Sequence, residues 1–138
     1  MIKIKFDVNI MKSISIFESL THASVKDCIE KDNKLLFIVK KGDIGKAIGK
    51  QGINIKKLEG MFKKGVRVIE HEDDILSFVR NVFYPNKAEN ITEEEGVVTI
   101  TPVDSTTRGY MIGRGATNLR AAEDIVKRYF DIKEIRVI

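Results

Sequence analysis

Residues 47–58 read AIGKQGINIKKL, and this stretch organises the rest of the chain. Two glycines, Gly49 and Gly52, bracket two polar residues, and an apolar periodic segment with lysines follows. Because glycine has no Cβ, it adopts a positive φ at little cost and lets another molecule's backbone approach closely. A helix that begins after Gly52 would point free N–H groups, near Ile53 and Asn54, back toward the loop and favour an anion there. Such a loop suits a nucleic-acid backbone, although glycine turns of this kind also occur without any ligand.

Length and charge indicate the number of domains and the kind of binding partner. The 138 residues correspond to one domain or to two very small ones, and 43% hydrophobic content supports a packed core. The formal net charge is +4, but it is unevenly distributed. Residues 1–71 hold 15 Lys and Arg against 8 Asp and Glu, whereas residues 72–138 hold 9 against 12. The first half therefore carries the basic surface, which fits a polyanionic partner.

Cysteine content and hydropathy indicate in which cellular compartment the protein is found. Cys28 is the only cysteine, so it forms no intramolecular disulfide and has no C-x-x-C partner for zinc. A reducing, intracellular setting is therefore expected. No apolar run reaches the ~18 residues of a membrane span, and the alternation of Ile2, Ile4 and Phe6 with charged residues lacks the apolar core of a signal peptide. We expect a soluble, cytoplasmic protein with no membrane contact.

Apolar residues of the first half fall at helix and strand spacings. Ile55, Leu58 and Phe62 are at i, i+3 and i+7, on one face of a helix. The continuous apolar run at 35–39 has the length of a buried strand. The predicted order is a strand or extended arm at 2–6 with Asp7 as a cap, a helix at 8–21, strands at 25–30 and 35–39 joined by a turn at 31–34, a helical turn at 44–48, a helix at 53–62 ended by Lys63-Lys64-Gly65, and a strand at 66–69.

The same order then begins again. Asp73 or Asp74 starts a helix whose apolar residues from Ile75 to Phe83 follow helical spacing, and Pro85 stops it. The elements predicted after it are a strand at 88–92, an acidic turn at 93–96, a strand at 97–101, a helix at 105–112, a helix reaching about residue 130, and a strand at 135–138.

An internal repeat connects the two halves. A shift of 64 residues places Ile48-Gly49-Lys50 on Ile112-Gly113-Arg114, and Asn54-Ile55-Lys56 on Asn118-Leu119-Arg120. One glycine loop could arise by chance, but the same loop twice, within the same order of elements, indicates a duplication. The sequence therefore predicts two small α/β modules, each with the order α-β-β-α-α-β.

The repeated loop carries a resemblance to a known family. Gly49-Lys50-Gln51-Gly52 with Ile55, repeated around residues 113–116, resembles a pair of KH domains. The strand and helix ahead of each core match the second topological type of this family. The resemblance implies an α/β (α+β) fold of two tandem type II KH domains, at 1–71 and 72–138, each with a three-stranded sheet. The pair is similar to that of the NusA family of transcription factors in its short archaeal form.

The resemblance also implies a function. KH domains bind single-stranded RNA, with the glycine loop clamping about four nucleotides of backbone. Lysines would supply salt-sensitive charge, and arginines in the second loop could hold phosphate bidentately. The NusA likeness implies a role in transcription elongation, termination or antitermination, with RNA polymerase as a protein partner. The candidate RNA-binding residues are Lys46, Ile48, Gly49, Lys50, Gln51, Gly52, Asn54, Ile55, Lys56, Ile112, Gly113, Arg114, Gly115, Ala116, Asn118 and Arg120.

One residue departs from the loop pattern. Ala116 stands where the pattern has glycine. If that position has a positive φ, alanine is strained there, and if φ is negative it is tolerated. Its methyl group could also hold the RNA backbone away. We therefore expect the second module to bind RNA less tightly than the first.

Other interpretations of the sequence stay open. A KH protein of ribosome assembly or RNA decay would use the same loops, and the acidic segment Glu93-Glu94-Glu95 allows a protein-interaction module instead. His71 lies among acidic residues, but consecutive residues rarely converge on one metal ion. No nucleophile, base and orienting acid stand at a recognisable spacing, so we expect neither an enzyme nor a cofactor.

Overall fold

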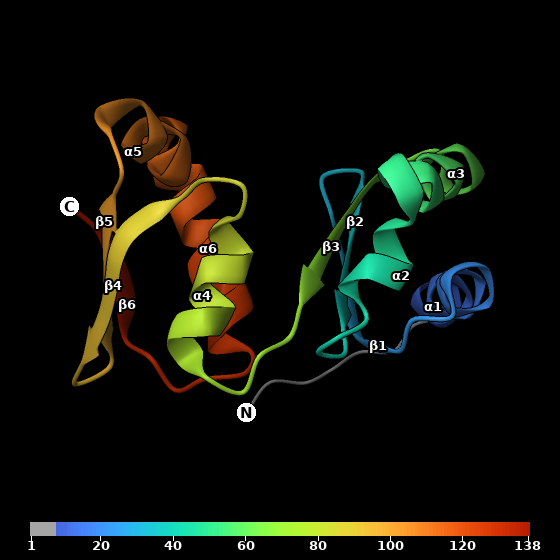
Figure 1. The fold of residues 1–138 in the computed structure, drawn as a ribbon, viewed down its shortest axis with the longest axis horizontal. Helices are drawn as coiled ribbons and strands as arrows, with labels where there is room; N and C mark the ends of the chain where they lie inside the picture. The colour runs from blue at the N-terminus through green and yellow to red at the C-terminus, as the bar shows by residue number, and fades with distance from the viewer. Residues whose placement is uncertain (1–7) are drawn as a thin grey trace. The chain divides into compact units, whose positions relative to one another are not determined.

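The computed structural model describes residues 8–138, so the strand or arm predicted at 2–6 and the cap predicted at Asp7 lie outside the described residues. The chain divides into two compact units (Figure 1). The first unit ends at Glu72, and the second begins at Asp73. This division falls within one residue of the predicted boundary between the modules.

The first unit follows the predicted order of elements. It consists of α1 (Val8–Thr21), β1 (Val25–Lys31), β2 (Lys34–Val39), α2 (Ile44–Ile48), the 3-10 turn η1 (Lys50–Gly52), α3 (Ile53–Phe62) and β3 (Gly65–Glu70). The bounds of all three α-helices agree with the sequence prediction, and each strand differs by one or two residues.

The second unit repeats this order. It consists of α4 (Ile75–Phe83), β4 (Ala88–Glu94), β5 (Val97–Pro102), α5 (Ser105–Ile112), η2 (Arg114–Ala116), α6 (Thr117–Lys127) and β6 (Glu134–Val137). Asp74 caps α4, because its carboxylate accepts the Ser77 amide hydrogen at 2.9 Å. Of the two predicted starting residues, Asp74 is therefore the cap.

Each unit contains one three-stranded sheet with the same topology. The strand orders are β1-β2-β3 and β4-β5-β6. The first two strands of each sheet are antiparallel, and the last strand runs parallel to the middle one. The helices of each unit pack on one face of its sheet (Figure 1). The predicted fold class, tandem α/β modules with three-stranded sheets, is therefore confirmed.

Aromatic side chains pack elements together within each unit. In the first unit Phe17 of α1 stacks on Phe37 of β2, with ring centroids 4.1 Å apart, and both side chains are fully buried. In the second unit Phe78 of α4 meets Tyr129 edge-on at 5.5 Å and Phe130 at 5.7 Å.

Helix α6 is shorter than predicted. It ends at Lys127 rather than near residue 130, and the amide groups of Tyr129 and Phe130 both donate to the Val126 carbonyl. This tightened last turn directs both rings toward Phe78. Tertiary packing of the two aromatics therefore ends the helix, which the helical spacing of the sequence did not indicate.

Two turns also differ in detail from prediction. The segment Lys63-Lys64-Gly65 does end α3, but the left-handed residue is Lys63, with φ 55°, and Gly65 begins β3. A Cβ on Gly65 would lie 3.2 Å from Cγ of Lys34, so this glycine serves the close strand pair. In the predicted acidic turn 93–96, β4 extends to Glu94, and only the last two residues form the turn.

Candidate nucleic-acid interface

A four-residue loop joins a short helix to a longer one in each unit. The first loop, residues 49–52, lies between α2 and α3, and the second loop, residues 113–116, lies between α5 and α6. Gly49 has φ 75° and ψ 171°, and Gly113 has φ 73° and ψ 174°. This backbone region is essentially restricted to glycine. The backbone therefore requires glycine at the first position of both loops.

The third and fourth residues of each loop are left-handed. In the first loop these are Gln51 (φ 56°) and Gly52 (φ 73°), and in the second loop they are Gly115 (φ 62°) and Ala116 (φ 62°). Ala116 therefore meets the condition under which strain was expected. Each loop, however, holds one glycine and one other residue in this region. Backbone strain is shared by both loops, which the glycine pattern of the sequence did not indicate.

Hydrogen bonds close both loops in the same way. The Gly52 amide donates to the Gly49 carbonyl at 3.1 Å, and the Ala116 amide donates to the Gly113 carbonyl at 3.2 Å. Each loop is therefore a tight turn with two residues at its centre. Lys50 is exposed in the first loop and Arg114 in the second. The two units present the same turn with a cationic side chain at the same position.

One expectation for the loop amides is wrong. Ile53 was expected to direct its N–H toward an anion, but this amide donates to the Lys50 carbonyl. Thr117 takes the same position in the second unit, and both its amide and its hydroxyl donate to the Arg114 carbonyl, the hydroxyl at 2.9 Å. In both units this amide hydrogen therefore bonds to a carbonyl of the loop itself and is not directed toward an anion.

The two candidate asparagines make matching bonds to the protein backbone. The side-chain amide of Asn54 donates to the Lys46 carbonyl at 2.9 Å. That of Asn118 donates to the Tyr110 carbonyl at 2.8 Å. In each unit the first turn of the long helix is thus tied to the short helix across the loop.

Three candidate lysines of the first unit lie on the loop or on the helices that flank it. Lys50 and Lys56 are exposed. Lys46 is also exposed, and its ammonium lies 3.8 Å from the Asp43 carboxylate. At a solvated surface such a pair is weak. The side chains of all three candidate lysines are therefore accessible to a polyanion.

Arg120 of the second unit, which corresponds to Lys56, is in a different environment. Arg120 lies 3.3 Å from the carboxylate of Glu123, whose side chain is only 6% exposed. The other oxygen of Glu123 accepts the Ile135 amide hydrogen at 2.8 Å. Arg120 is thus paired with an internal anion, whereas Arg114 is exposed at the loop. Of the two candidate arginines of the second unit, Arg120 therefore has a carboxylate partner within the protein, although its own side chain is 69% exposed.

Comparisons with known proteins agree with this geometry. The family model for the KH domain matches residues 12–85. The chain belongs to the KH domain family. It is 35% identical to a probable transcription termination protein NusA of Methanocaldococcus jannaschii, over 100% of this chain and 77% of that protein. It is 32% identical to the protein of the same name from Halococcus morrhuae, over 92% of this chain and 93% of that one.

A solved structure has the same fold. The crystal structure of APE1850 matches this KH chain with a TM-score of 0.76 and 29% identity, covering 96% of this chain and 100% of that one. The relatives and this structure match nearly the whole of the chain. The resemblance to archaeal NusA proteins drawn from the loops is therefore confirmed.

Apolar side chains flank each KH loop. Ile48 is 37% exposed before the first loop, whereas Ile55 is partly buried and packs against the core. Ile112 is partly buried before the second loop. Two further exposed residues lie beside the loops, Ile53 at 48% and Tyr110 at 64%. From the sequence, Tyr110 could either stack on a base or pack locally, and its exposure leaves the ring available for stacking. Ile53 was not a candidate, although its position directly after the first loop could have indicated it.

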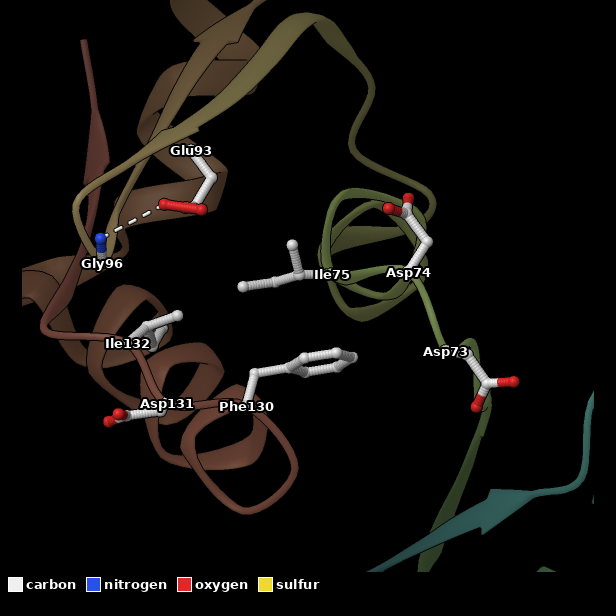
Figure 2. Close-up of a pocket in the computed structure, with 8 residues that line it drawn as sticks. All are labelled: Asp73, Asp74, Ile75, Glu93, Gly96, Phe130, Asp131 and Ile132. Carbon is white, nitrogen blue, oxygen red and sulfur yellow. Dashed lines mark hydrogen bonds between the residues drawn. The ribbon is translucent and has the colours of Figure 1, made fainter.

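A separate depression in the second KH unit has the wrong charge for RNA. Figure 2 shows three apolar side chains, Ile75, Phe130 and Ile132, facing its centre. The rest of the lining is Asp73, Asp74, Glu93, Asp131 and Gly96. Glu93 is occupied by a hydrogen bond from the Gly96 amide at 3.2 Å. Carboxylates repel phosphate, so this depression is distinct from the nucleic-acid interface.

Side chains that could ligate a metal ion do not gather in the described part of the chain. Among residues 8–138, no group of three or more His, Cys, Asp or Glu side chains is placed to hold a metal ion. Cys28, the single cysteine of the sequence, is buried. Over the same residues, no helix has the length and apolar character needed to cross a membrane.

Proposed function

We propose that this protein binds single-stranded RNA through its two KH loops and acts as a transcription termination factor of the NusA type. The observation that carries the proposal is the recurrence of one loop conformation, with glycine at φ near 75° and ψ near 171°, in both KH units. The name shared by the archaeal relatives, probable transcription termination protein, supports the role in transcription.

In the proposed complex, each loop receives a phosphate of the RNA backbone. Gly49 lets the backbone approach, and the amides of Lys50 and Gln51, at the centre of the turn, face the phosphate oxygens. The exposed side chains of Lys50 and Lys56 add charge. Bases then lie on apolar surface that includes Ile48, where hydrogen bonds to base edges read the sequence. The equivalent proposal for the second loop uses Gly113, Gly115, Ala116, Arg114 and Ile112.

Charge reversal in the first loop tests the RNA-binding proposal. Lys50→Asp with Gln51→Asp places two carboxylates where the phosphate would lie, and both native side chains are exposed, so the fold should persist. We expect RNA affinity to fall at least ~10-fold, and the dependence of log Kd on log salt to flatten by ~0.7 for each phosphate that the loop no longer binds. Fluorescence anisotropy with a labelled single-stranded RNA at two salt concentrations measures both.

A control variant distinguishes the effect of charge in the loop on RNA affinity from the effect of the net charge of the protein. Lys31→Asp with Asn33→Asp makes the same charge change at the β1–β2 turn. The Asn33 carbonyl accepts the Gly65 amide hydrogen at 3.3 Å, which places this turn at the opposite end of α3 from the loop. The control should bind RNA nearly as the native protein does. Equal losses in both variants would show that only net charge matters and would remove the loop from the mechanism.

The role in transcription is tested through the protein partners. We propose that the protein associates with RNA polymerase during elongation and termination. An affinity-tagged chain should then co-purify with polymerase subunits after nuclease treatment. Recovery of ribosomal particles without polymerase would favour ribosome assembly or RNA decay instead.

A further inference from the structure

The asparagine that follows each loop makes the same contact in both units. Asn54 and Asn118 each bond to a carbonyl eight residues earlier, at 2.9 and 2.8 Å. Those carbonyls belong to Lys46 and Tyr110, in the last turns of α2 and α5. The last carbonyls of a helix have no partner within the helix and need a donor from elsewhere. The asparagine amide supplies that donor in both units.

Each asparagine also packs on the first glycine of its loop. A Cβ built on Gly49 would lie 2.8 Å from Nδ2 and 2.9 Å from Cγ of Asn54. A Cβ built on Gly113 would lie 2.7 Å from the same two atoms of Asn118. Real Cβ atoms do not approach other atoms so closely. The glycine and the asparagine, five residues apart, therefore fit each other, and this fit is a second reason for glycine at that position.

The two contacts together close a bridge over the loop. The bridge runs from the long helix to the short one, and the four loop residues lie within it. Two of those residues hold left-handed backbone, which only Gly visits readily. A loop restrained before RNA arrives loses less conformational freedom on binding.

We propose that Asn54 and Asn118 are positioning residues, which hold each loop in its binding conformation rather than contact RNA through their amide groups. The proposal rests on the proposed RNA-binding function. It assigns to the two asparagines a role different from that of the lysines and arginines. Asn54→Ala should loosen the first loop and leave the second loop as it is.

The test uses the full chain with Asn54→Ala. Amide hydrogen exchange by NMR, without RNA, reports how often each loop opens. Removal of one hydrogen bond should speed exchange in the first loop by about 3- to 10-fold, with the second loop as the internal reference. Anisotropy with labelled oligo(U) should show a loss of affinity no larger than the change in exchange, because affinity follows the fraction of molecules whose loop is closed. Asn90→Ala, at an exposed asparagine of β4, is the matched control and should change neither value.

The outcomes separate the inference from the function on which it rests. If affinity falls while exchange in the first loop is unchanged, Asn54 contacts RNA directly and the positioning role is overturned. Unchanged exchange with unchanged affinity overturns it as well. If the native protein does not bind RNA, the proposed function fails, but faster exchange in the free variant still supports the bridge. Asn118→Ala repeats the test on the second loop should Asn54→Ala fail to fold.

Discussion

The fourth residue of each loop is the clearest difference between the two units. Gly52 and Ala116 have nearly the same backbone, with φ 73° and 62°. A Cβ on Gly52 would meet no atom within 4 Å, so alanine fits sterically at this position. The remaining penalty is the left-handed backbone itself, about 1–2 kcal/mol for a residue with a Cβ. In the proposed complex, the methyl group of Ala116 would also hold the RNA backbone farther from the loop.

Reciprocal substitutions at this position should have opposite effects. Ala116→Gly should raise the free energy of unfolding by about 1 kcal/mol, and Gly52→Ala should lower it by a similar amount. Urea denaturation followed by circular dichroism measures both. Ala116→Gly should also strengthen RNA binding. Two substitutions that shifted stability in the same direction would show that φ does not control these positions.

A carboxylate on the long helix accepts a hydrogen bond from the last strand in each unit. Glu123 of α6 accepts the Ile135 amide hydrogen of β6 at 2.8 Å, and Glu59 of α3 accepts the Val66 amide hydrogen of β3 at 3.0 Å. Glu123 is only 5% exposed, whereas Glu59 is exposed. Water can replace the carboxylate of Glu59 more easily than that of Glu123.

Alanine at these two positions should therefore have unequal effects. Glu123→Ala leaves a buried amide without its acceptor and should destabilise the protein by about 1–3 kcal/mol. Glu59→Ala, the matched control, should cost less than about 1 kcal/mol, because this hydrogen bond is only partly buried and water can take the place of the exposed Glu59 carboxylate. Thermal unfolding of both variants checks this order. Equal effects would contradict the role of burial.

The helix caps of the second unit make stability depend on pH. The Ser77 amide hydrogen, with help from the Ser77 hydroxyl, lowers the pKa of Asp74 below its usual 3.8. The Thr107 amide hydrogen, with help from the Thr107 hydroxyl, lowers the pKa of Asp104 in the same way at the start of α5. A carboxylate whose folded-state pKa is depressed stabilises the fold above its unfolded pKa. That stabilisation disappears as the pH falls through the lower, folded-state pKa.

Substitution of both capping aspartates by asparagine measures how much their titration contributes to the pH dependence of stability. Asp74→Asn with Asp104→Asn keeps an acceptor at each cap but removes the titrating group. The native protein should lose stability steadily as the pH falls below about 4, and the double variant should lose less over that interval. Melting temperatures measured across the acid range give the comparison. Parallel curves for the two proteins would exclude the caps as a source of the acid sensitivity.

Sequence patterns predicted the elements better than the contacts between them. The helix at 53–62 was predicted with its observed bounds because its apolar spacing and the preceding glycine turn agree. The end of α6 was not, because Tyr129 and Phe130 pack on Phe78, a partner some fifty positions away in the chain. The internal carboxylate of Glu123 was missed for the same reason. Long-range packing leaves no local periodic signal.

The candidate site was predictable in its residue types but not in its roles. The repeat placed Asn54 and Asn118 beside the loops, and both lie there. Their bonds to backbone carbonyls depend on how the short helix ends, which spacing alone does not specify. The strain at Gln51 was likewise missed, because left-handed backbone at a residue other than glycine is uncommon. Tertiary structure decides both features.

At the scale of the whole molecule, the two units carry matching loops but unequal charge. Residues 1–71 hold a net charge of +7 and residues 72–138 a net charge of −3. The second loop also has Ala116 at its fourth position, and Arg120 is paired with Glu123. In the proposed complex, all three features favour weaker binding of phosphate by the second unit. We therefore expect the first unit to supply most of the RNA affinity and the second to reinforce it.

Charge reversal in one loop at a time tests this division. Lys50→Asp in the first loop should weaken binding to a long single-stranded RNA more than Arg114→Asp does in the second. If one RNA binds both loops, the second binding event is intramolecular, and the overall affinity rises although neither loop makes additional contacts. Arg114→Asp should then weaken binding to a long RNA clearly but barely change binding to an RNA that fills one loop. Its salt dependence on the long RNA should flatten by ~0.7 for each phosphate that the second loop releases. If Arg114→Asp matched the native protein on both RNAs, the second loop would not bind RNA, and its resemblance to the first would be structural only.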